Sequence, residues 1–451
     1  MPRRGLWDLL TLFAGKSSGV IVALIFLPLY NKTLGVEQFG IVAVILSVQA
    51  FAVMMDLGMA TLIARYAALA ISKTEQTAAF LNSVELALAV FYFGLLSCTL
   101  LVLPLLGYSN HQGLIVVGSI LLCWLFVLQN IYYASMLARM EYQTANLIQT
   151  AGNLVRGFVT AGALIYYSAT PLTFVAAQII TTALHCSITR ISLNRSLGGA
   201  FLLFTSKTRY KVSEAIGLIK QGRSITLFTV AGASVMQLDK PLISAFSSAA
   251  NVAPYFLATT VCMLPIALLA GPLSQYFQPK ILIAIEAQNT QAAQQLLQRF
   301  VLLLLLAIGL PSLALWLVRD WAIGLWLGPS ATNAIIAHYV AIMLPGFAMG
   351  ALGFVPYALL LSSKDFRYQA QMSVALTVVT LAAVALFAWL QRVDAVCFTY
   401  MFYHIASTAL SWARACNLPQ VNKLAWGALI SASKGIALLC ITTVLVLQVQ
   451  F

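Results

Sequence analysis

The stretch Asn146–Tyr167, NLIQTAGNLVRGFVTAGALIYY, combines the length of a membrane-spanning helix with regularly spaced polar side chains. As a helix it covers about 33 Å, enough to cross a hydrocarbon core of about 30 Å. Spacings of three and four place the polar residues on one side of the helix. That side cannot face lipid, where each unsatisfied polar group costs several kcal/mol, so it faces neighbouring helices or water. The polar residues on this side are Asn146, Gln149, Thr150, Asn153, Arg156 and Thr160.

The composition of the whole chain agrees with a membrane-embedded helical protein. Of its 451 residues, 61% are hydrophobic and only 8% are charged, whereas about one quarter of the residues in a soluble protein are charged. Most of the excess positive charge lies between apolar runs, which indicates membrane topology and not nucleic-acid binding. The seven cysteines are scattered and form no Cys-x-x-Cys pair, so no metal site, disulfide framework or cofactor is expected.

Apolar segments of membrane-spanning length recur along the chain and predict an all-α polytopic protein. Twelve spans are expected, and a further C-terminal segment is long enough for a thirteenth. They cover residues 6–30, 40–64, 80–106, 114–137, 146–167, 172–191, 224–246, 252–276, 300–318, 334–361, 371–390 and 395–413, with the further segment at 426–447.

The loop charges predict the orientation of these spans. With a cytoplasmic N-terminus, eighteen Lys and Arg residues lie at the inner face and three at the outer face. This excess predicts a cytoplasmic N-terminus by the positive-inside rule. The longest basic loop, 192–223, is predicted to link two six-helix bundles, 1–191 and 224–415, with 416–451 holding the extra C-terminal helix.

Short internal matches favour a duplication of the six-helix unit. Tyr142-Gln-Thr-Ala resembles Tyr368-Gln-Ala, and Thr181-Thr-Ala-Leu resembles Ser407-Thr-Ala-Leu, both at a separation of 226 residues. Six helices per repeat give both halves the same orientation. Transporters built in this way alternate access by movement of one half against the other.

Several polar residues within the spans suggest a cationic cavity. Intramembrane ionisable groups are candidates for functional sites, and Arg suits phosphate because of its fork of donors. We predict that Arg156, Lys16 and Lys240, with the amides of Asn153 and Gln149, bind an anionic substrate. Lys16 lies near the predicted inner interface, so snorkelling to the cytoplasm is an alternative to a cavity role.

Four further groups are candidates for coupling to an ion gradient, namely Asp56, Asp239, His185 and His404. Helix packing or an ion pair is the alternative for each of them. Asp239 and Lys240 are adjacent, point about 100° apart on a regular helix and need not pair. A neutral imidazole can take up a proton near neutral pH, which is the reason for including the histidines.

The order of several short motifs resembles Wzx-type polysaccharide flippases of the MOP exporter superfamily. They are Pro28-Leu-Tyr-Asn-Lys-Thr-Leu-Gly-Val-Glu-Gln-Phe-Gly40, Met55-Asp-Leu-Gly-Met59, Asp239-Lys240, Ser274-Gln-Tyr-Phe-Gln-Pro279 and Leu325-Trp-Leu-Gly328. The resemblance implies a MATE-like fold with two six-helix bundles in a pseudo-two-fold arrangement. It departs from the family pattern at the segment 426–447.

The same resemblance implies a function. Such a protein moves undecaprenyl-pyrophosphate-linked oligosaccharide, such as an O-antigen repeat unit, across the bacterial inner membrane by alternating access, and is not an enzyme. Expected partners are this lipid-linked substrate, membrane lipid, a coupling H⁺, Na⁺ or anion, and the polysaccharide polymerase and chain-length regulator. No nucleic acid is expected.

Three alternative functions remain open from the sequence. A MATE-type multidrug or cation antiporter would be expected to carry unpaired carboxylates in its cavity, whereas basic residues predominate here. A lipid II flippase would be expected to have fourteen helices. A membrane-embedded polysaccharide polymerase would need a sizeable outer loop, and the longest one here, 319–333, is short.

Overall fold

The computed structural model describes residues 3–54, 74–105, 107, 109–199, 223–434 and 437. Side chains at 3–17, 74, 76 and 223–229 lie outside this description. Within the described residues the regular structure is helical and contains no strand. The predicted all-α class is therefore confirmed.

Helix α1 (Arg3–Met54) contains the first predicted crossing and the second as far as residue 54, joined without a long loop. It is interrupted at Gly35, where φ is 76° and ψ is 167°, a conformation that residues with a side chain rarely adopt. The interruption falls between the predicted spans that end at Tyr30 and begin at Gly40. One glycine thus sets the turn from the first crossing to the second.

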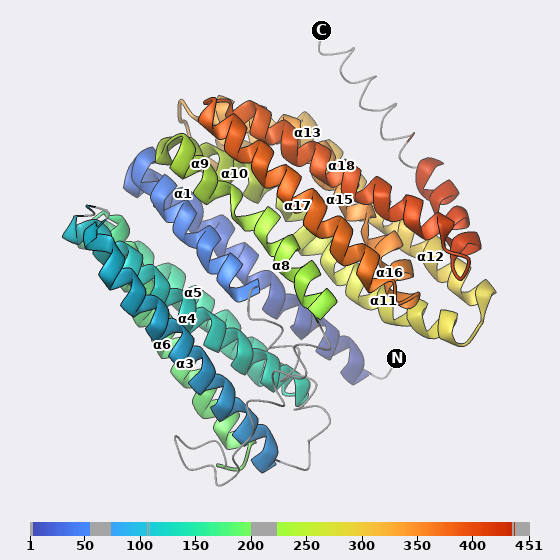
Figure 1. Ribbon diagram of the computed structural model, residues 1–451, viewed down its shortest axis with the longest axis horizontal. Helices are drawn as coiled ribbons and strands as arrows, with labels where there is room; N and C mark the ends of the chain where they lie inside the picture. Colours follow the sequence, from blue (N-terminus) through green and yellow to red (C-terminus); the bar gives the residue numbers. More distant parts are fainter. Residues whose placement is uncertain are drawn as a thin grey trace. The chain divides into compact units, whose positions relative to one another are not determined.

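The remaining helices of the N-terminal unit pack around α1. Neighbouring pairs include α1 with α5, α4 with α6, and α5 with α6 (Figure 1). Ser109 and Gln112 form a capping box at the start of α4, and Thr170 caps α6 with Pro171 in its first position, where a missing N–H costs nothing. The helices are α3 (Thr74–Leu105), α4 (Asn110–Ala138), α5 (Tyr142–Tyr166), α6 (Pro171–Ser196) and α8 (Arg223–Gln237).

The C-terminal unit contains two long helices that each include a π-helical segment. One segment, η1, joins α10 to α11, and the other, η2, joins α12 to α13. A short helix, α14, forms in the stretch that hydropathy predicts as an outer loop. The elements from the break after α8 onward are α9 (Asp239–Phe246), α10 (Ala249–Pro265), η1 (Ile266–Ala270), α11 (Gly271–Glu286), α12 (Thr290–Leu304), η2 (Leu305–Gly309), α13 (Leu310–Leu317), α14 (Arg319–Leu327), α15 (Asn333–Leu352), α16 (Phe354–Ser362), α17 (Phe366–Trp389) and α18 (Val393–Asn417).

Among the described residues, eight helices are long and apolar enough to cross a membrane. They occupy Ser18–Met54, Thr77–Leu105, Asn110–Ala138, Pro171–Ser196, Ala249–Glu286, Thr290–Leu317, Asn333–Ser362 and Phe366–Trp389. Helices α5 and α18 also coincide with predicted spans, but their polar stripes lower their hydropathy. The protein is therefore a multi-pass membrane protein.

The chain divides into two compact units, Met1–Pro241 and Leu242–Phe451. The two units share a pattern of neighbours, since α4 and α5 each pack against α6, and α15 and α17 each pack against α18. Each unit also has its own apolar core, around Phe80 and Val127 in the first and around Phe300 and Val355 in the second. The division into bundles 1–191 and 224–415 stays a prediction.

The extra C-terminal helix is described only at its start. Residues 422–434 are helical, and of the remainder the structure describes residue 437 alone. Whether the predicted segment 426–447 spans the membrane therefore lies outside the described residues.

Candidate functional site

The polar residues predicted to share one side of α5, from Asn146 to Thr160, face the interior of the N-terminal unit, and we call them the α5 stripe. Asn146, Asn153 and Thr160 are buried, while Leu147 and Phe158 on the opposite side of α5 are 71% and 66% exposed. A helix in a hydrocarbon surrounding must bury its polar side among other helices, and its apolar side can stay exposed to lipid. The sequence therefore predicts the orientation of α5 within its unit correctly.

The cytoplasmic half of the stripe, in the predicted orientation, is bonded to α4. Tyr133 donates from its hydroxyl to Asn146 Oδ1 at 2.7 Å. Gln129 Nε2 lies 3.4 Å from Gln149 Oε1 and 2.9 Å from His185 Nε2. A single glutamine of α4 thus connects the stripe to α6.

Arg156 lies at the centre of the stripe. Its Nη2 donates to Asn153 Oδ1 at 2.7 Å, and Asn153 Nδ2 donates to Ser18 Oγ of α1 at 3.1 Å. The guanidinium carbon lies 4.7 Å from the centre of the Phe126 ring of α4, a cation–π contact. In the part of the chain that the structure describes, Arg156 makes no ion pair with a carboxylate.

The outer half of the stripe connects α5 to α6 and α1. Gln178 Nε2 donates to Thr160 Oγ1 at 3.1 Å, and Tyr30 donates from its hydroxyl to the Gly157 carbonyl at 3.1 Å. The stripe and its partners on α1, α4 and α6 form several hydrogen-bonded groups along the interior, which we call the polar core of the N-terminal unit.

Two glycines allow α5 to approach its neighbours closely. A Cβ built on Gly152 would lie 2.4 Å from His185 Nδ1, and one built on Gly157 would lie 2.4 Å from Cε2 of Phe26. Any larger residue at either position would displace these rings. The glycines therefore determine how closely α6 and α1 pack on α5.

Asp239 and Lys240 form an ion pair in the structure. Lys240 Nζ lies 2.9 Å from Asp239 Oδ1 and donates to the Met236 carbonyl at 3.0 Å, and both side chains are buried. The regular-helix geometry that separates adjacent side chains does not hold here, because α8 ends at Gln237 and α9 begins at Asp239. The charges of these two candidate site residues therefore compensate each other.

The other predicted residues lie in separate places. Lys16 belongs to α1, but its side chain is outside the described residues, and so is Asp56. His404 lies in α18 of the C-terminal unit, with its ring 4.4 Å from that of Phe347. Of the predicted set, the structure brings Asn153 and Arg156 into direct contact, and it connects Gln149 with His185 through Gln129.

A second charged cluster connects α3, α4 and α6. Arg190 Nε lies 2.9 Å from Glu85 Oε1 and its Nη2 lies 3.3 Å from Oε2, a two-pronged pair to which Tyr132 adds a hydrogen bond. Through these contacts Glu85 of α3 links α4 and α6.

Little in the sequence indicates the partners of the α5 stripe. Ser18 follows Lys16 and Ser17, Gln129 stands beside Asn130, and Phe126 is an aromatic residue in an apolar run, so spacing singles out none of the three. The amide pair Gln129-Asn130 in the fourth span is a usable sign, because a buried amide requires a partner.

Comparison with known proteins agrees with this architecture. Residues 7–281 match the family model described as polysaccharide biosynthesis protein. The chain belongs to this family. No curated protein sequence matches it.

The fold of this family member is that of MATE transporters. An inward-facing multidrug resistance MATE family transporter of the MOP superfamily aligns with a TM-score of 0.65 and 11% identity, covering 94% of this chain and 95% of the other. A Vibrio cholerae MATE transporter aligns with a TM-score of 0.62 and 14% identity, covering 90% and 95%. A Pyrococcus furiosus MOP superfamily transporter, described as having a binding pocket of reverse polarity that suggests a different function, aligns with a TM-score of 0.63 and 10% identity, covering 94% and 96%. The predicted MATE-like fold is thus confirmed.

Proposed function

We propose that this protein is a flippase that moves an undecaprenyl-pyrophosphate-linked oligosaccharide across the bacterial inner membrane by alternating access. The observation that carries the proposal is Arg156, a cation in the polar core whose described partners are a neutral amide and an aromatic ring. A charge at the centre of a membrane helix costs roughly 2.5–3.5 kcal/mol on insertion scales. An anionic headgroup would compensate it.

The carboxylates that the structure describes inside the N-terminal unit are already paired with basic residues. This pairing favours an anionic substrate over a cationic one. Glu85 is paired with Arg190, and Asp239 is paired with Lys240. A cation antiporter would need a carboxylate available to its substrate. A MOP superfamily transporter of similar fold from Pyrococcus furiosus is described as having a binding pocket of reverse polarity, which supports a cationic pocket in this fold.

The α5 stripe offers the groups that such a headgroup needs. The five donors of the Arg156 guanidinium match phosphate oxygens, and the amides of Asn153 and Gln149 can exchange their present partners for sugar hydroxyls. Lys16 is proposed to add positive charge to the path, and Lys240 is proposed to do so when its ion pair with Asp239 opens. The polyprenyl tail would remain in hydrocarbon while the headgroup crosses.

Orientation and coupling complete the proposal. The N-terminus is cytoplasmic, and the halves 1–191 and 224–415 move against each other with the basic linker 192–223 between them. Movement is coupled to H⁺, Na⁺ or an anion, with Asp56, Asp239, His185 and His404 as candidate groups. The polymerase and the chain-length regulator act on the product at the outer face.

The test is complementation of a bacterial strain that lacks its own repeat-unit flippase. Arg156→Ala is expected to abolish surface polysaccharide at unchanged protein level, whereas Arg156→Lys retains part of it because the charge remains. Arg195→Ala, at an exposed arginine near the end of α6, is the matched control and should export normally. Normal polysaccharide from Arg156→Ala would overturn the proposal, and cation-dependent drug resistance conferred by the wild type would favour the antiporter.

A further inference from the structure

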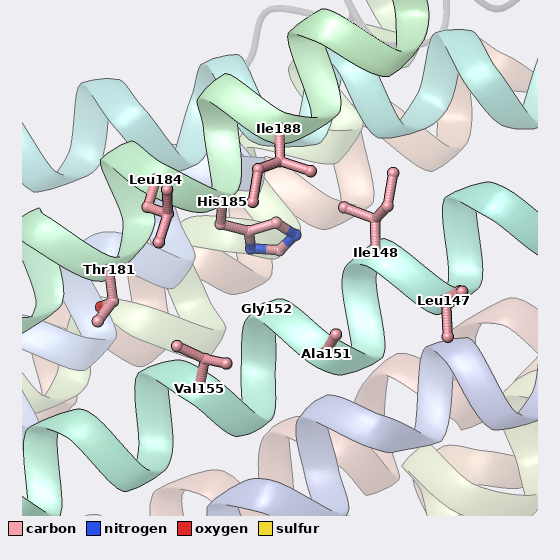
Figure 2. A pocket seen from close by; sticks show the side chains of 9 residues that line it. All are labelled: Leu147, Ile148, Ala151, Gly152, Val155, Thr181, Leu184, His185 and Ile188. Atoms are coloured by element: carbon pink, nitrogen blue, oxygen red, sulfur yellow. The ribbon is translucent and has the colours of Figure 1, made fainter.

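A groove runs between α5 and α6 on the outside of the N-terminal unit, behind the polar core. Figure 2 shows Ile148 and Val155 of α5 facing Leu184 and Ile188 of α6 across it, and Leu147 also lines it. Its cavity volume is about 190 Å³. An apolar cavity of roughly 150 Å³ holds a benzene-sized molecule, so the groove accommodates a short segment of a hydrocarbon chain.

His185 lies at the base of this groove. It is 4% exposed, and its Nδ1 has no hydrogen-bond partner among the described residues. The absence of a side chain at Gly152 lets the ring lie against α5. The depth of the groove therefore depends on this one glycine.

The rim of the groove is suited to hydrocarbon. Leu147 and Leu184 are 71% and 55% exposed, and Val155 and Ile188 are also exposed. α6 is apolar enough to span a membrane, and exposed aliphatic side chains on such a helix contact lipid chains and not water. The occupant must therefore be an apolar chain.

The groove is connected to the proposed headgroup site. His185 Nε2 lies 2.9 Å from Gln129 Nε2, and the same amide contacts Gln149 of the α5 stripe. One helix, α5, thus carries an apolar groove on its outer side and Arg156 with its amides on its inner side. An amphiphile with an anionic head and a long apolar tail fits both sides, whereas a free sugar or a soluble anion fits only the inner one.

The height of the groove matches the leaflet in which such a lipid would be loaded. Leu147 lies five residues and Val155 thirteen residues after the start of α5 at Tyr142. With a cytoplasmic N-terminus these positions are about 8 Å and 20 Å from the inner end of the helix. The groove therefore opens to the inner leaflet.

We propose that the α5–α6 groove binds a segment of the isoprenoid tail of the transported lipid. The inference rests on the proposed function and adds to it a site for the tail, separate from the site for the headgroup. A groove of this size holds only a short part of the tail. Short polyprenyl chains are therefore expected to compete with long ones.

The test is site-specific photocrosslinking of the full chain in nanodiscs. A benzoylphenylalanine is placed at Leu184, in the groove, or at Ile180, which is 69% exposed on α6 and lies outside the groove. Radiolabelled undecaprenyl phosphate should label position 184 at least fivefold more than position 180, and farnesyl phosphate should compete. Labelled phosphatidylglycerol should not distinguish the two positions.

Two variants connect the labelling to the groove. Ala151→Trp, which fills the groove from its rim, should lower labelling at position 184 to the level at 180 without changing the melting temperature. Ile180→Trp, combined with the probe at 184, is the matched control and should leave labelling unchanged. Equal polyprenyl labelling of positions 180 and 184 would overturn the proposed tail site. A preference of phosphatidylglycerol for position 184 as large as that of undecaprenyl phosphate would overturn it as well.

Complementation separates this inference from the proposed function. A wild-type protein that restores surface polysaccharide but labels positions 180 and 184 alike would overturn the groove alone. One that labels position 184 selectively but restores no polysaccharide would overturn the flippase function alone.

Discussion

Asn153 holds the guanidinium of Arg156 with one end of its amide and α1 with the other. Its Oδ1 accepts from Arg156 Nη2 at 2.7 Å, and its Nδ2 donates to Ser18 Oγ at 3.1 Å. Because the acceptor is neutral, it orients the cation without cancelling its charge. The pair therefore links the position of Arg156 to the packing of α1 on α5.

Asn153→Asp tests the importance of the uncancelled charge. A carboxylate at this position would neutralise Arg156, so export should fall at least tenfold in a complementation assay while the protein remains folded. Asn153→Ala should also reduce export and lower the free energy of unfolding by about 1–3 kcal/mol, because it leaves buried groups unpaired. Gln143→Ala, at an exposed position at the start of α5, should do neither. Full export by the aspartate variant would show that the charge is not used.

Gly157→Ala is expected to destabilise the protein. The added Cβ would lie 2.4 Å from the ring of Phe26, and overpacking of this kind costs typically 1–3 kcal/mol. Gly162 lies on the same helix with no atom within 4 Å of its would-be Cβ, so Gly162→Ala should be neutral or slightly stabilising. Thermal unfolding in detergent compares the two, and equal melting temperatures would contradict the close packing of α1 on α5.

The Glu85–Arg190 pair should be structural. Its side chains are 19% and 23% exposed, so Glu85→Gln should lower the free energy of unfolding by about 1–3 kcal/mol, with part of the electrostatic loss screened by solvent. Asp394→Asn, which disrupts the exposed Arg392–Asp394 pair, should leave the melting temperature unchanged. If Glu85→Gln instead abolished export at an unchanged melting temperature, the carboxylate would be a coupling group.

Cysteine labelling distinguishes the two sides of α5. In a variant that lacks the native cysteines, Thr150→Cys on the α5 stripe should react with a membrane-impermeant thiol reagent at least tenfold faster than Val159→Cys. Val159 is on the exposed apolar side, where hydrocarbon keeps the thiol protonated and excludes the reagent. Equal rates, or faster reaction at position 159, would contradict a water-accessible polar core.

The sequence predicts the helices and the direction of the α5 stripe well, because both depend on local periodicity. It does not predict the partners of the stripe, because Gln129, Phe126 and Ser18 are distant in the chain and carry no local pattern. The Asp239–Lys240 pair stayed open for another reason, since a regular helix would point the two side chains about 100° apart and the break between α8 and α9 is not visible in the sequence. Helix α14 was missed because its nine residues are too few for a membrane span.

The π-helical segments affect how the two halves can be compared. A π turn holds one residue more than an α turn, and the predicted ninth span contains η2 whereas α3, its counterpart as third span, is α-helical throughout. An alignment that keeps every helix free of gaps therefore slips by one residue at η2, and the side chains beyond it are matched to the wrong face. The internal matches lie just before the fifth and eleventh spans and within the sixth and twelfth, all beyond the slip. A search for ancestral similarity between the halves needs a one-residue insertion at η2.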